Sequence, residues 1–255
     1  MTDMYQDGTY IKHNPLLHEE DSEYKFRYIR MMLNGLRFDG EHIFVLDVGG
    51  GAGIVAAQVC QFLSSKGARV ECHAFDLSPE MLLIQRTNNP YVTLATSDFN
   101  QIRAFGGYDV ALLIDVIEHI PDNGQFADDI DKLAHYVIYN IPTERNVFDW
   151  LRNIRMGGKY YSFQTKMLGH VHFFSAISAK RFIASHHHLL RWVLPDYCGH
   201  LLESDHPSYI RQRASKLRRV ELSLSRLIYK YIRPIAPLII HGSLFFLAES
   251  RRRIG

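Results

Sequence analysis

Acidic residues and a glycine loop follow four short apolar runs of the sequence. The first run leads into a loop with glycines at alternate positions, and each of the next three runs ends close to an aspartate. These residues are Asp47 with Gly49, Gly51 and Gly53, then Asp76, then Asp98, and finally Asp115 with Glu118 and His119. Glycines let the backbone turn sharply and approach a ligand closely, and a carboxylate can accept hydrogen bonds from both hydroxyls of a ribose. The pattern therefore predicts binding of a nucleoside-containing cofactor.

Two kinds of cofactor fit this pattern. Gly51, Gly53 and Ala56 have the G-x-G-x-x-A spacing, and Asp76 follows Ala56 by 20 positions (76 minus 56), which meets the dinucleotide fingerprint. Asp47 argues against a dinucleotide, because its carboxylate stands just ahead of the glycines and would repel an anionic pyrophosphate. The same carboxylate would attract an ammonium group. On these residues alone, both possibilities stay open.

The elements that position these residues alternate between strand and helix. Apolar runs predict strands over 43–48, 69–75, 91–96, 110–114 and 136–141, and helical periodicity predicts helices over 54–63, 79–87 and 123–133. Such alternation is typical of a parallel sheet that is covered by helices on both faces. Ligands of such sheets bind at the carboxyl ends of the strands, where the four acidic groups would lie together.

The remaining segments suggest an elaborated single domain. We expect a first helix over 21–36, an irregular stretch after the fifth strand, a helix over 175–187, a strand over 190–194, a long basic helix and a last strand over 243–248. No linker divides two cores. We therefore divide the chain into a lid and helix at 1–36 and a main domain at 37–255, with a basic helical insertion at about 205–235.

Four motifs carry a family resemblance. DVGGGAG resembles the D-x-G-x-G-x-G loop of class I S-adenosylmethionine-dependent methyltransferases, and FDLSPEML, SDF and IDVIEHIPD are similar to the next three motifs of that family, in the same order. GHVHFFS and GSLFFLAES resemble its small-molecule branch. The resemblance covers about 21–250. It implies an α/β, Rossmann-like, doubly wound sheet of seven strands with an antiparallel last strand, and S-adenosylmethionine as cofactor.

The resemblance also implies which residues contact the cofactor. They are Asp47, Gly49, Gly51 and Gly53 at the methionine end, Asp76 at the ribose, Leu77, Asp98 and the Phe99 amide at the adenine, and the Asp115 backbone carbonyl beside the sulfonium. Tyr10 and His18, with Glu19, belong to a segment that resembles the lid of some small-molecule members, which closes over the cofactor and excludes water. The alternative for each single acid is a helix cap or a surface carboxylate.

Three histidines are candidates for the catalytic base. A hydroxyl acceptor must lose a proton, and histidine titrates closest to neutral pH. His119 directly follows the fourth strand and is the first candidate; its alternative role is to support the turn before Pro121. His170 and His172 alternate as on an extended segment, so both would point to one side, where they could line the acceptor pocket or replace His119 as base. Their alternative role is packing within the loop.

A metal ion is a further alternative. Asp115, Glu118 and His119 resemble the E-x-x-E-H of the ubiquinone-pathway O-methyltransferases, in which that cluster is linked to a divalent metal. Here aspartate replaces the first glutamate, which shortens one arm of the site. We therefore expect no metal ion.

Composition limits the other functions. The 255 residues are 47% hydrophobic and 22% charged, which is typical of a globular protein, and the net charge of +2 is too small to indicate a nucleic-acid partner. Three cysteines are too few for a disulfide framework and indicate reduced thiols. The polar amino terminus lacks the apolar stretch of a secretory signal, so we expect a cytoplasmic protein.

The segment 211–233 is strongly basic, although the net charge of the whole chain is small. Its arginines and lysines accompany an apolar stripe, which could pack on the sheet and leave the charges solvated, the interpretation that we favour here. The alternative is contact with an anionic substrate or with a membrane surface as a peripheral protein.

The sequence thus predicts a methyltransferase that acts on a hydroxyl, or as second choice an amine, of a small or carrier-linked metabolite. The alternatives are an NAD-dependent oxidoreductase and a non-catalytic cofactor-binding scaffold at a membrane surface. A small-molecule acceptor is expected and no nucleic acid, but the acceptor itself is not identified by these residues.

Overall fold

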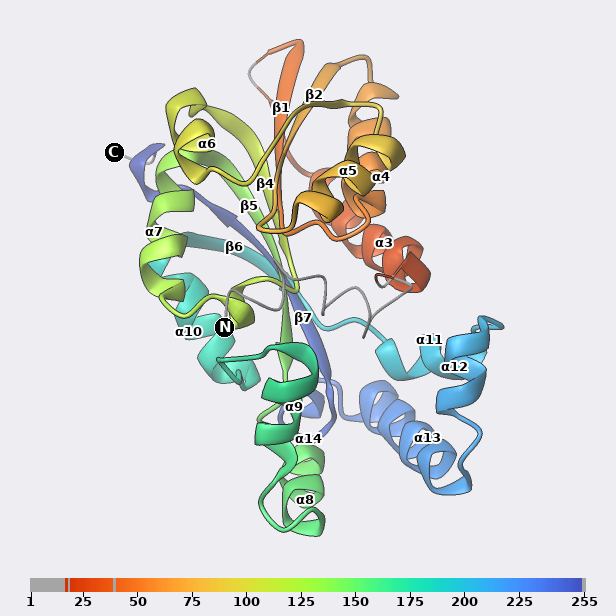
Figure 1. The fold of residues 1–255 in the computed structure, drawn as a ribbon. Coiled ribbons are helices and arrows are strands. Elements are labelled where there is room, and N and C mark those ends of the chain that lie inside the picture. Colours follow the sequence, from red (N-terminus) through yellow and green to blue (C-terminus); the bar gives the residue numbers. More distant parts are fainter. Residues whose placement is uncertain (1–16, 18, 39, 254–255) are drawn as a thin grey trace.

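A seven-stranded sheet forms the centre of the protein in the computed structural model, which describes residues 17, 19–38 and 40–253 (Figure 1). The strands are β1 (His42–Val48), β2 (Arg69–Phe75), β3 (Val92–Thr96), β4 (Tyr108–Ile114), β5 (Ala134–Thr143), β6 (His188–Val193) and β7 (Gly242–Glu249). Their order is β3-β2-β1-β4-β5-β7-β6, and β7 runs antiparallel to both of its neighbours. The predicted fold class, including the antiparallel last strand, is confirmed.

Helices cover both faces of the sheet. On one face, α3 (Ser22–Leu33) and α4 (Ile54–Ser64) contribute buried side chains such as Ile29 and Val59, and α5 (Pro79–Asn88) packs beside α4. On the other face, α6 (Phe99–Phe105), α7 (Asn123–Leu133) and α10 (Ala176–His186) contribute Ile102, Ile130 and Ile183 (Figure 1). The two-sided cover explains why the central strands are apolar on both faces.

The register of the parallel strands brings the predicted acidic residues to one edge. Val48, the last residue of β1, pairs with Phe75 of β2 and with Leu113 of β4. Asp76 and Asp115 directly follow these two strands, so both aspartates lie beside the loop that leaves β1. This edge is the carboxyl end of the sheet, where parallel α/β proteins bind their ligands.

Two regions differ from the expected elements. The stretch after β5, expected to be irregular, contains α8 (Val147–Arg155) and α9 (Tyr160–Leu168). The expected long basic helix is a series of shorter helices, α11 (Tyr197–Glu203), α12 (Pro207–Gln212), α13 (Lys216–Tyr231) and α14 (Ala236–Ile239). Prolines explain part of the division, because α12 begins at Pro207 and α13 ends before Pro234.

The apolar stripe of α13 faces solvent. Leu222 and Ser225 on the opposite face are buried, and the helix packs through that face against α11. The exposed side chains are Leu217, Val220, Leu224, Leu227 and Tyr231. The expectation that the predicted stripe packs on the sheet is therefore wrong for Leu217, Leu224, Leu227 and Tyr231, whereas Ile228, its remaining member, is half-buried and packs against the core.

Two further observations bear on the sequence analysis. Cys60, Cys72 and Cys198 are free and buried, as expected of reduced thiols. Among the described residues, no helix combines the length and the apolar character that crossing a membrane requires.

The close packing at Gly53 gives a testable prediction. Gly53 and Gly107 both have a φ of +76°, but a Cβ at Gly53 would lie 3.0 Å from the Cα of Gln85, whereas a Cβ at Gly107 would meet no atom within 4 Å. Gly107→Ala should therefore lower the free energy of unfolding by about 1–2 kcal/mol from backbone strain alone. Gly53→Ala should cost at least about 1 kcal/mol more, because the neighbouring helix must move. Urea denaturation measures both variants, and equal losses would contradict the proposed close contact.

Candidate functional site

The glycine loop between β1 and α4 encloses the Asp47 side chain. Gly49, Gly51 and Gly53 have φ values of +59°, +55° and +76°, a backbone conformation that residues other than glycine rarely adopt. Gly50, which the sequence analysis did not single out, is packed more tightly still. A Cβ there would lie 1.9 Å from Oδ2 of Asp47. The loop therefore fits over a buried carboxylate, and the run of three glycines was the signal for it.

Asp47 and Asp76 are two buried acids whose environments disfavour negative charge. Burial and, to a smaller extent, the nearby Asp76 raise the pKa of Asp47 to about 7. Burial also raises the pKa of Asp76 to about 6, against the opposing effect of hydrogen bonds from the Ser78 backbone N–H (2.9 Å) and from Gln85 Nε2 (3.4 Å). A ligand with a positive charge or with hydroxyl donors would stabilise both carboxylates here.

The predicted adenine contacts lie beside β2 and β3. Leu77 is 38% exposed after the end of β2. Asp98 is exposed and caps α6, because its Oδ1 accepts a hydrogen bond from the Asn100 backbone N–H at 2.9 Å. The ring of Phe99 packs on Phe75, with 5.1 Å between ring centroids. Asp98 thus has the capping role that was its alternative, and contact of these residues with adenine stays a prediction.

Of the three predicted lid residues, the structure describes only Glu19. Tyr10 and His18 lie outside the described residues. Glu19 is exposed in the short helix η1 (Glu19–Asp21). Its neighbour Asp21, which the sequence analysis missed, lines a cavity, and burial raises the pKa of this aspartate to about 6.

That cavity has a volume of about 220 Å³ and lies at the carboxyl ends of β4 and β5, next to the start of β7. Its walls come from α3, the turn after β4, α9 and the segment before β7. The acidic and basic residues that line it are Asp21, Lys25, Asp115, Glu118, His119, Glu144, His170 and His241. The cavity adjoins the glycine loop through Asp115, so it is suited to a second, polar ligand beside the cofactor.

Glu118 is the most unusual residue of the cavity. Its side chain is fully buried, and neither carboxylate oxygen has a hydrogen-bond partner in the described part of the chain. Burial raises the pKa of this glutamate, and the nearby Asp115 raises it further. The Glu118 backbone carbonyl accepts hydrogen bonds from Val171 and His172 (2.9 and 3.0 Å), which ties the short helix η2 (Ile117–His119) to the loop after α9.

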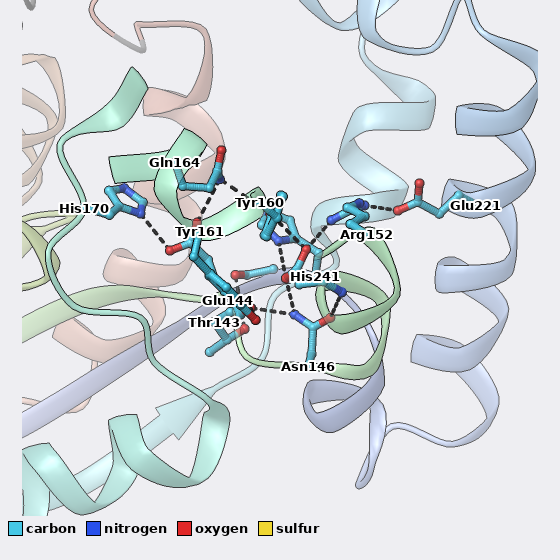
Figure 2. A network of polar contacts seen from close by, with 12 residues as sticks. Thr143, Glu144, Asn146, Arg152, Tyr160, Tyr161, Gln164, His170, Glu221 and His241 are labelled. Atoms are coloured by element: carbon cyan, nitrogen blue, oxygen red, sulfur yellow. Dashed lines mark hydrogen bonds and ion pairs between the residues drawn. The ribbon is translucent and has the colours of Figure 1, made fainter. Parts of the chain in front are cut away.

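His119 and His170 meet above Glu118. Their ring centroids are 4.8 Å apart, and one potential ligand atom from each of Glu118, His119 and His170 lies within 4.8 Å of the others. Burial and, to a smaller extent, the nearby His170 lower the pKa of His119 to about 4. His170 Nδ1 is 2.7 Å from Oε2 of Glu144, whose other oxygen accepts a hydrogen bond from Gln164 (Figure 2).

His172 does not line the cavity. Its Nε2 lies 3.0 Å from the Pro121 carbonyl oxygen, on the outside of the loop. The expectation that His170 and His172 point to one side is therefore wrong. Residues 170–172 are not in a strand, so the alternation of an extended chain does not apply to them.

Asp115 is held apart from the other two residues of the predicted cluster. Its φ is +58°, its Oδ2 forms an ion pair with Lys25 Nζ at 2.9 Å, and its Oδ1 accepts a hydrogen bond from Asn140 at 2.6 Å. His170, rather than Asp115, completes the group with Glu118 and His119. The sequence contained no signal for this exchange, because His170 comes from a loop about 50 positions later in the chain.

A polar network supports the far wall of the cavity. The buried Asp149 of α8 accepts hydrogen bonds from Arg152 and from the Tyr160 hydroxyl (3.0 Å), and it pairs with His241 Nδ1 at 2.9 Å (Figure 2). Arg152 also pairs with Glu221 of α13. The network therefore joins α8, α9, α13 and the segment before β7. Sequence reasoning missed it because its members are spread over 92 positions.

Comparisons with known proteins agree with the fold and with the family that the motifs indicated. A family model described as a methyltransferase domain matches residues 21–184. A search of curated proteins gives no significant match.

Solved structures share the fold at low sequence identity. A chain from the complex of the Haloferax volcanii Trm112 methyltransferase activator with a methyltransferase is 12% identical, with a TM-score of 0.58 and with 91% of this chain and 92% of that chain covered. StiE O-MT residues 961–1257 are 14% identical (TM-score 0.52; 94% and 81% covered), and the CMeT domain of the citrinin polyketide synthase is 13% identical (TM-score 0.52; 98% and 55% covered).

The family model covers well over half of the chain, and the sheet has the strand order and the antiparallel last strand that the motifs implied. The chain therefore belongs to the class I S-adenosylmethionine-dependent methyltransferases.

Proposed function

We propose that this protein transfers the methyl group of S-adenosylmethionine to a hydroxyl group, or as second choice an amine, of a small or carrier-linked metabolite. The observation that carries the proposal is the polar cavity beside the glycine loop. It contains two imidazoles and a buried carboxylate that has no hydrogen-bond partner among the described residues. The carboxylate and the imidazole nitrogens of such a cavity can accept a hydrogen bond from the hydroxyl or amine that would receive the methyl group.

The residues at the carboxyl ends of β1 to β4 fit the cofactor. The glycine loop has no room for a Cβ at Gly50, so its backbone can pack directly on the Asp47 carboxylate. Asp47 would bind the ammonium group, and Asp76 the ribose hydroxyls. The remaining proposed contacts are Gly49, Gly51 and Gly53 along the methionine, Leu77, Asp98 and Phe99 at the adenine, the Asp115 carbonyl beside the sulfonium, and Tyr10 and His18 in the lid. When bound, S-adenosylmethionine supplies a methyl group on a sulfonium that leaves readily.

The cavity residues would orient the acceptor and take its proton. An imidazole whose pKa is near 4 is a weak base at neutral pH, so His119 is suited to accepting a hydrogen bond rather than a proton. His170 is better placed as base. Its Nδ1–H can donate to Glu144, which fixes the ring and stabilises the imidazolium that forms when Nε2 takes a proton. Glu118 would hold the acceptor through its carboxylate oxygens, which have no hydrogen-bond partner in the described part of the chain.

We also propose where the enzyme acts and what its basic segment contacts. The three free cysteines suit a reducing compartment, and we propose the cytoplasm. The basic segment 211–233 would contact an acceptor that carries phosphate or is associated with a membrane, since its apolar stripe is exposed. Asp47 counts against the NAD-dependent alternative, because its buried side chain lies where a pyrophosphate would pass.

Cofactor binding should depend on pH through Asp47. In the free protein its pKa is about 7, and an ammonium partner favours the ionised form. The affinity for S-adenosylhomocysteine should therefore fall as the pH drops from 8 to 6, by up to about tenfold per pH unit below 7. Asp76, with a pKa of about 6, should add to the loss below pH 6. Titration calorimetry measures this dependence, and Asp47→Asn should bind more weakly and flatten the profile between pH 8 and 6.

NADH is the matched control in that experiment. It should give neither heat of binding nor thermal stabilisation. Stabilisation by NADH without stabilisation by S-adenosylhomocysteine would contradict the proposed function and favour the oxidoreductase.

The role of His170 can be tested once candidate acceptors have been screened for the mass gain of one methyl transfer. His170→Gln should lower kcat by about 10²–10⁴-fold, since a positioned base contributes that much. Glu144→Gln should lower kcat less and shift its pH profile, because the imidazolium loses its carboxylate partner. His172→Gln is the control and should leave kcat within about twofold, since His172 lies outside the cavity. All three variants should bind S-adenosylhomocysteine normally, and an unchanged kcat in His170→Gln would exclude it as base.

A further inference from the structure

The outer face of α8 is apolar and exposed. Val147, Trp150, Leu151 and Ile154 occupy positions i, i+3, i+4 and i+7 of the helix, so they lie on one face. Between 45% and 57% of each of these side chains is accessible to solvent. The inner face holds the buried Asp149 and its network. The exposed face is therefore not a failure of local packing, since the helix is firmly attached through its other side.

The outer face of α13 has the same character. Its exposed apolar residues recur at intervals of three and four positions, which again places them on one face. They are Leu217 (61% exposed), Val220 (65%), Leu224 (47%), Leu227 (53%) and Tyr231 (71%). Leu222 and Ser225 hold the opposite face against the protein. We call the exposed apolar side chains of α8 and α13 the docking face.

Positive charge accompanies the docking face. Lys216, Arg219 and Lys230 are exposed on α13, and within the described residues none of the three has an acidic partner. The single acid of α13, Glu221, is already paired with Arg152 and with Arg218 (2.7 Å). The charge that remains without compensation on this side is therefore positive, which is complementary to an anionic surface.

The two helices are attached to each other. The Arg152–Glu221 ion pair joins α8 directly to α13, and α14 packs against both helices. Both helices lie at the same end of the molecule, beyond the carboxyl edge of the sheet (Figure 1). The adjoining α9 exposes Phe163 and Met167 to solvent and contributes Gln164 and Leu168 to the cavity wall. Elements that carry or adjoin the docking face thus also enclose the cavity.

We propose that the docking face binds the protein peripherally to an anionic lipid bilayer. Two short amphipathic helices with apolar, aromatic and basic residues can lie in the headgroup region, and no described helix is long and apolar enough to span a bilayer. Trp150 and Tyr231 are the residue types that favour this interface. In the part of the inference that rests on the proposed function, the acceptor is a membrane-borne amphiphile whose polar group enters the cavity from the bilayer.

A bilayer fits this surface better than a second copy of the chain does. Two copies joined through the docking face would bring Lys216, Arg219 and Lys230 of each close to the same cations of the other, without acids to neutralise them. An anionic bilayer instead takes up the apolar side chains and compensates the flanking cations.

The experiment uses the full chain and vesicle flotation. Vesicles of phosphatidylcholine containing about one third phosphatidylglycerol should carry the protein upward at low salt, whereas pure phosphatidylcholine vesicles should not, and raised salt should weaken binding. The double variant Leu224→Glu, Leu227→Glu should lower the bound fraction by roughly fivefold or more, and Lys216→Glu, Arg219→Glu should lower it on anionic vesicles. Leu83→Glu is the matched control, because Leu83 on α5 is 68% exposed and lies away from the docking face; it should bind like the wild type.

Three outcomes would overturn the inference. They are equal binding to neutral and anionic vesicles, a Leu224→Glu, Leu227→Glu variant that binds like Leu83→Glu, and a wild-type dimer in light scattering that this double variant converts to a monomer. Unchanged affinity for S-adenosylhomocysteine shows that each variant is folded. Flotation needs neither cofactor nor acceptor, so a failure of the proposed methyl transfer and a failure of membrane docking are observed separately.

Discussion

Parallel pairing of β1 with β2 and β4 is the constraint on which the site depends. The register ends the three strands level with one another, and the residues that follow them are therefore neighbours although they are far apart in sequence. Asp76 and Asp115, which follow β2 and β4, therefore lie at the same edge as Asp47, the last residue but one of β1. A shift of one residue in either pairing would turn the side chains at the strand ends to the opposite face of the sheet, which would separate the acids from the glycine loop. The hydrophobic cores on both faces prevent such a shift, because the strands bury apolar side chains on each side.

The same edge concentrates carboxylates in a poorly solvated region, and this arrangement costs stability. Burial raises the pKa values of four carboxyl groups, those of Asp21, Asp47, Asp76 and Glu118. The ionised forms of these groups are therefore destabilised in the ligand-free protein. As the pH rises through these raised values, ionisation makes the folded state less stable than it is at lower pH. Ligands that bring an ammonium group, hydroxyl donors or a proton remove part of that cost. Stability and ligand binding are therefore coupled at this site, which is common where charged groups are arranged for function rather than for folding.

The sequence was sufficient for the sheet and for the grouping of acids beside the glycine loop, and insufficient for the polar cavity. Strand periodicity, the run of glycines and the acids after each strand are local signals, and they predicted the residues near Asp47 and Asp76. His170, Glu144 and the Asp149 network come together through contacts between segments that vary freely on this fold, so no local pattern identifies their partners. The prediction for His172 was wrong because it assumed a strand where the chain forms a loop. The prediction for α13 was wrong because an apolar stripe indicates that a face is buried somewhere, but does not say whether protein, lipid or another chain covers it.

The acceptor side is built from helices that have two different faces. Inward, α8 and α9 present Asp149, Tyr160 and Gln164, whose hydrogen bonds hold Glu144 and His170 in the cavity wall. Outward, these helices present apolar side chains such as Trp150 and Phe163 to solvent. An element that is polar toward the protein and apolar toward solvent reverses the usual pattern of a globular surface, and such a reversal is expected where the surface meets a second apolar phase or partner. Because the inner polar network fixes the helices, movement at the outer face would be transmitted to the residues that face the acceptor. A lipid surface or partner that covers α8 and α13 would therefore contact the same elements that enclose the cavity.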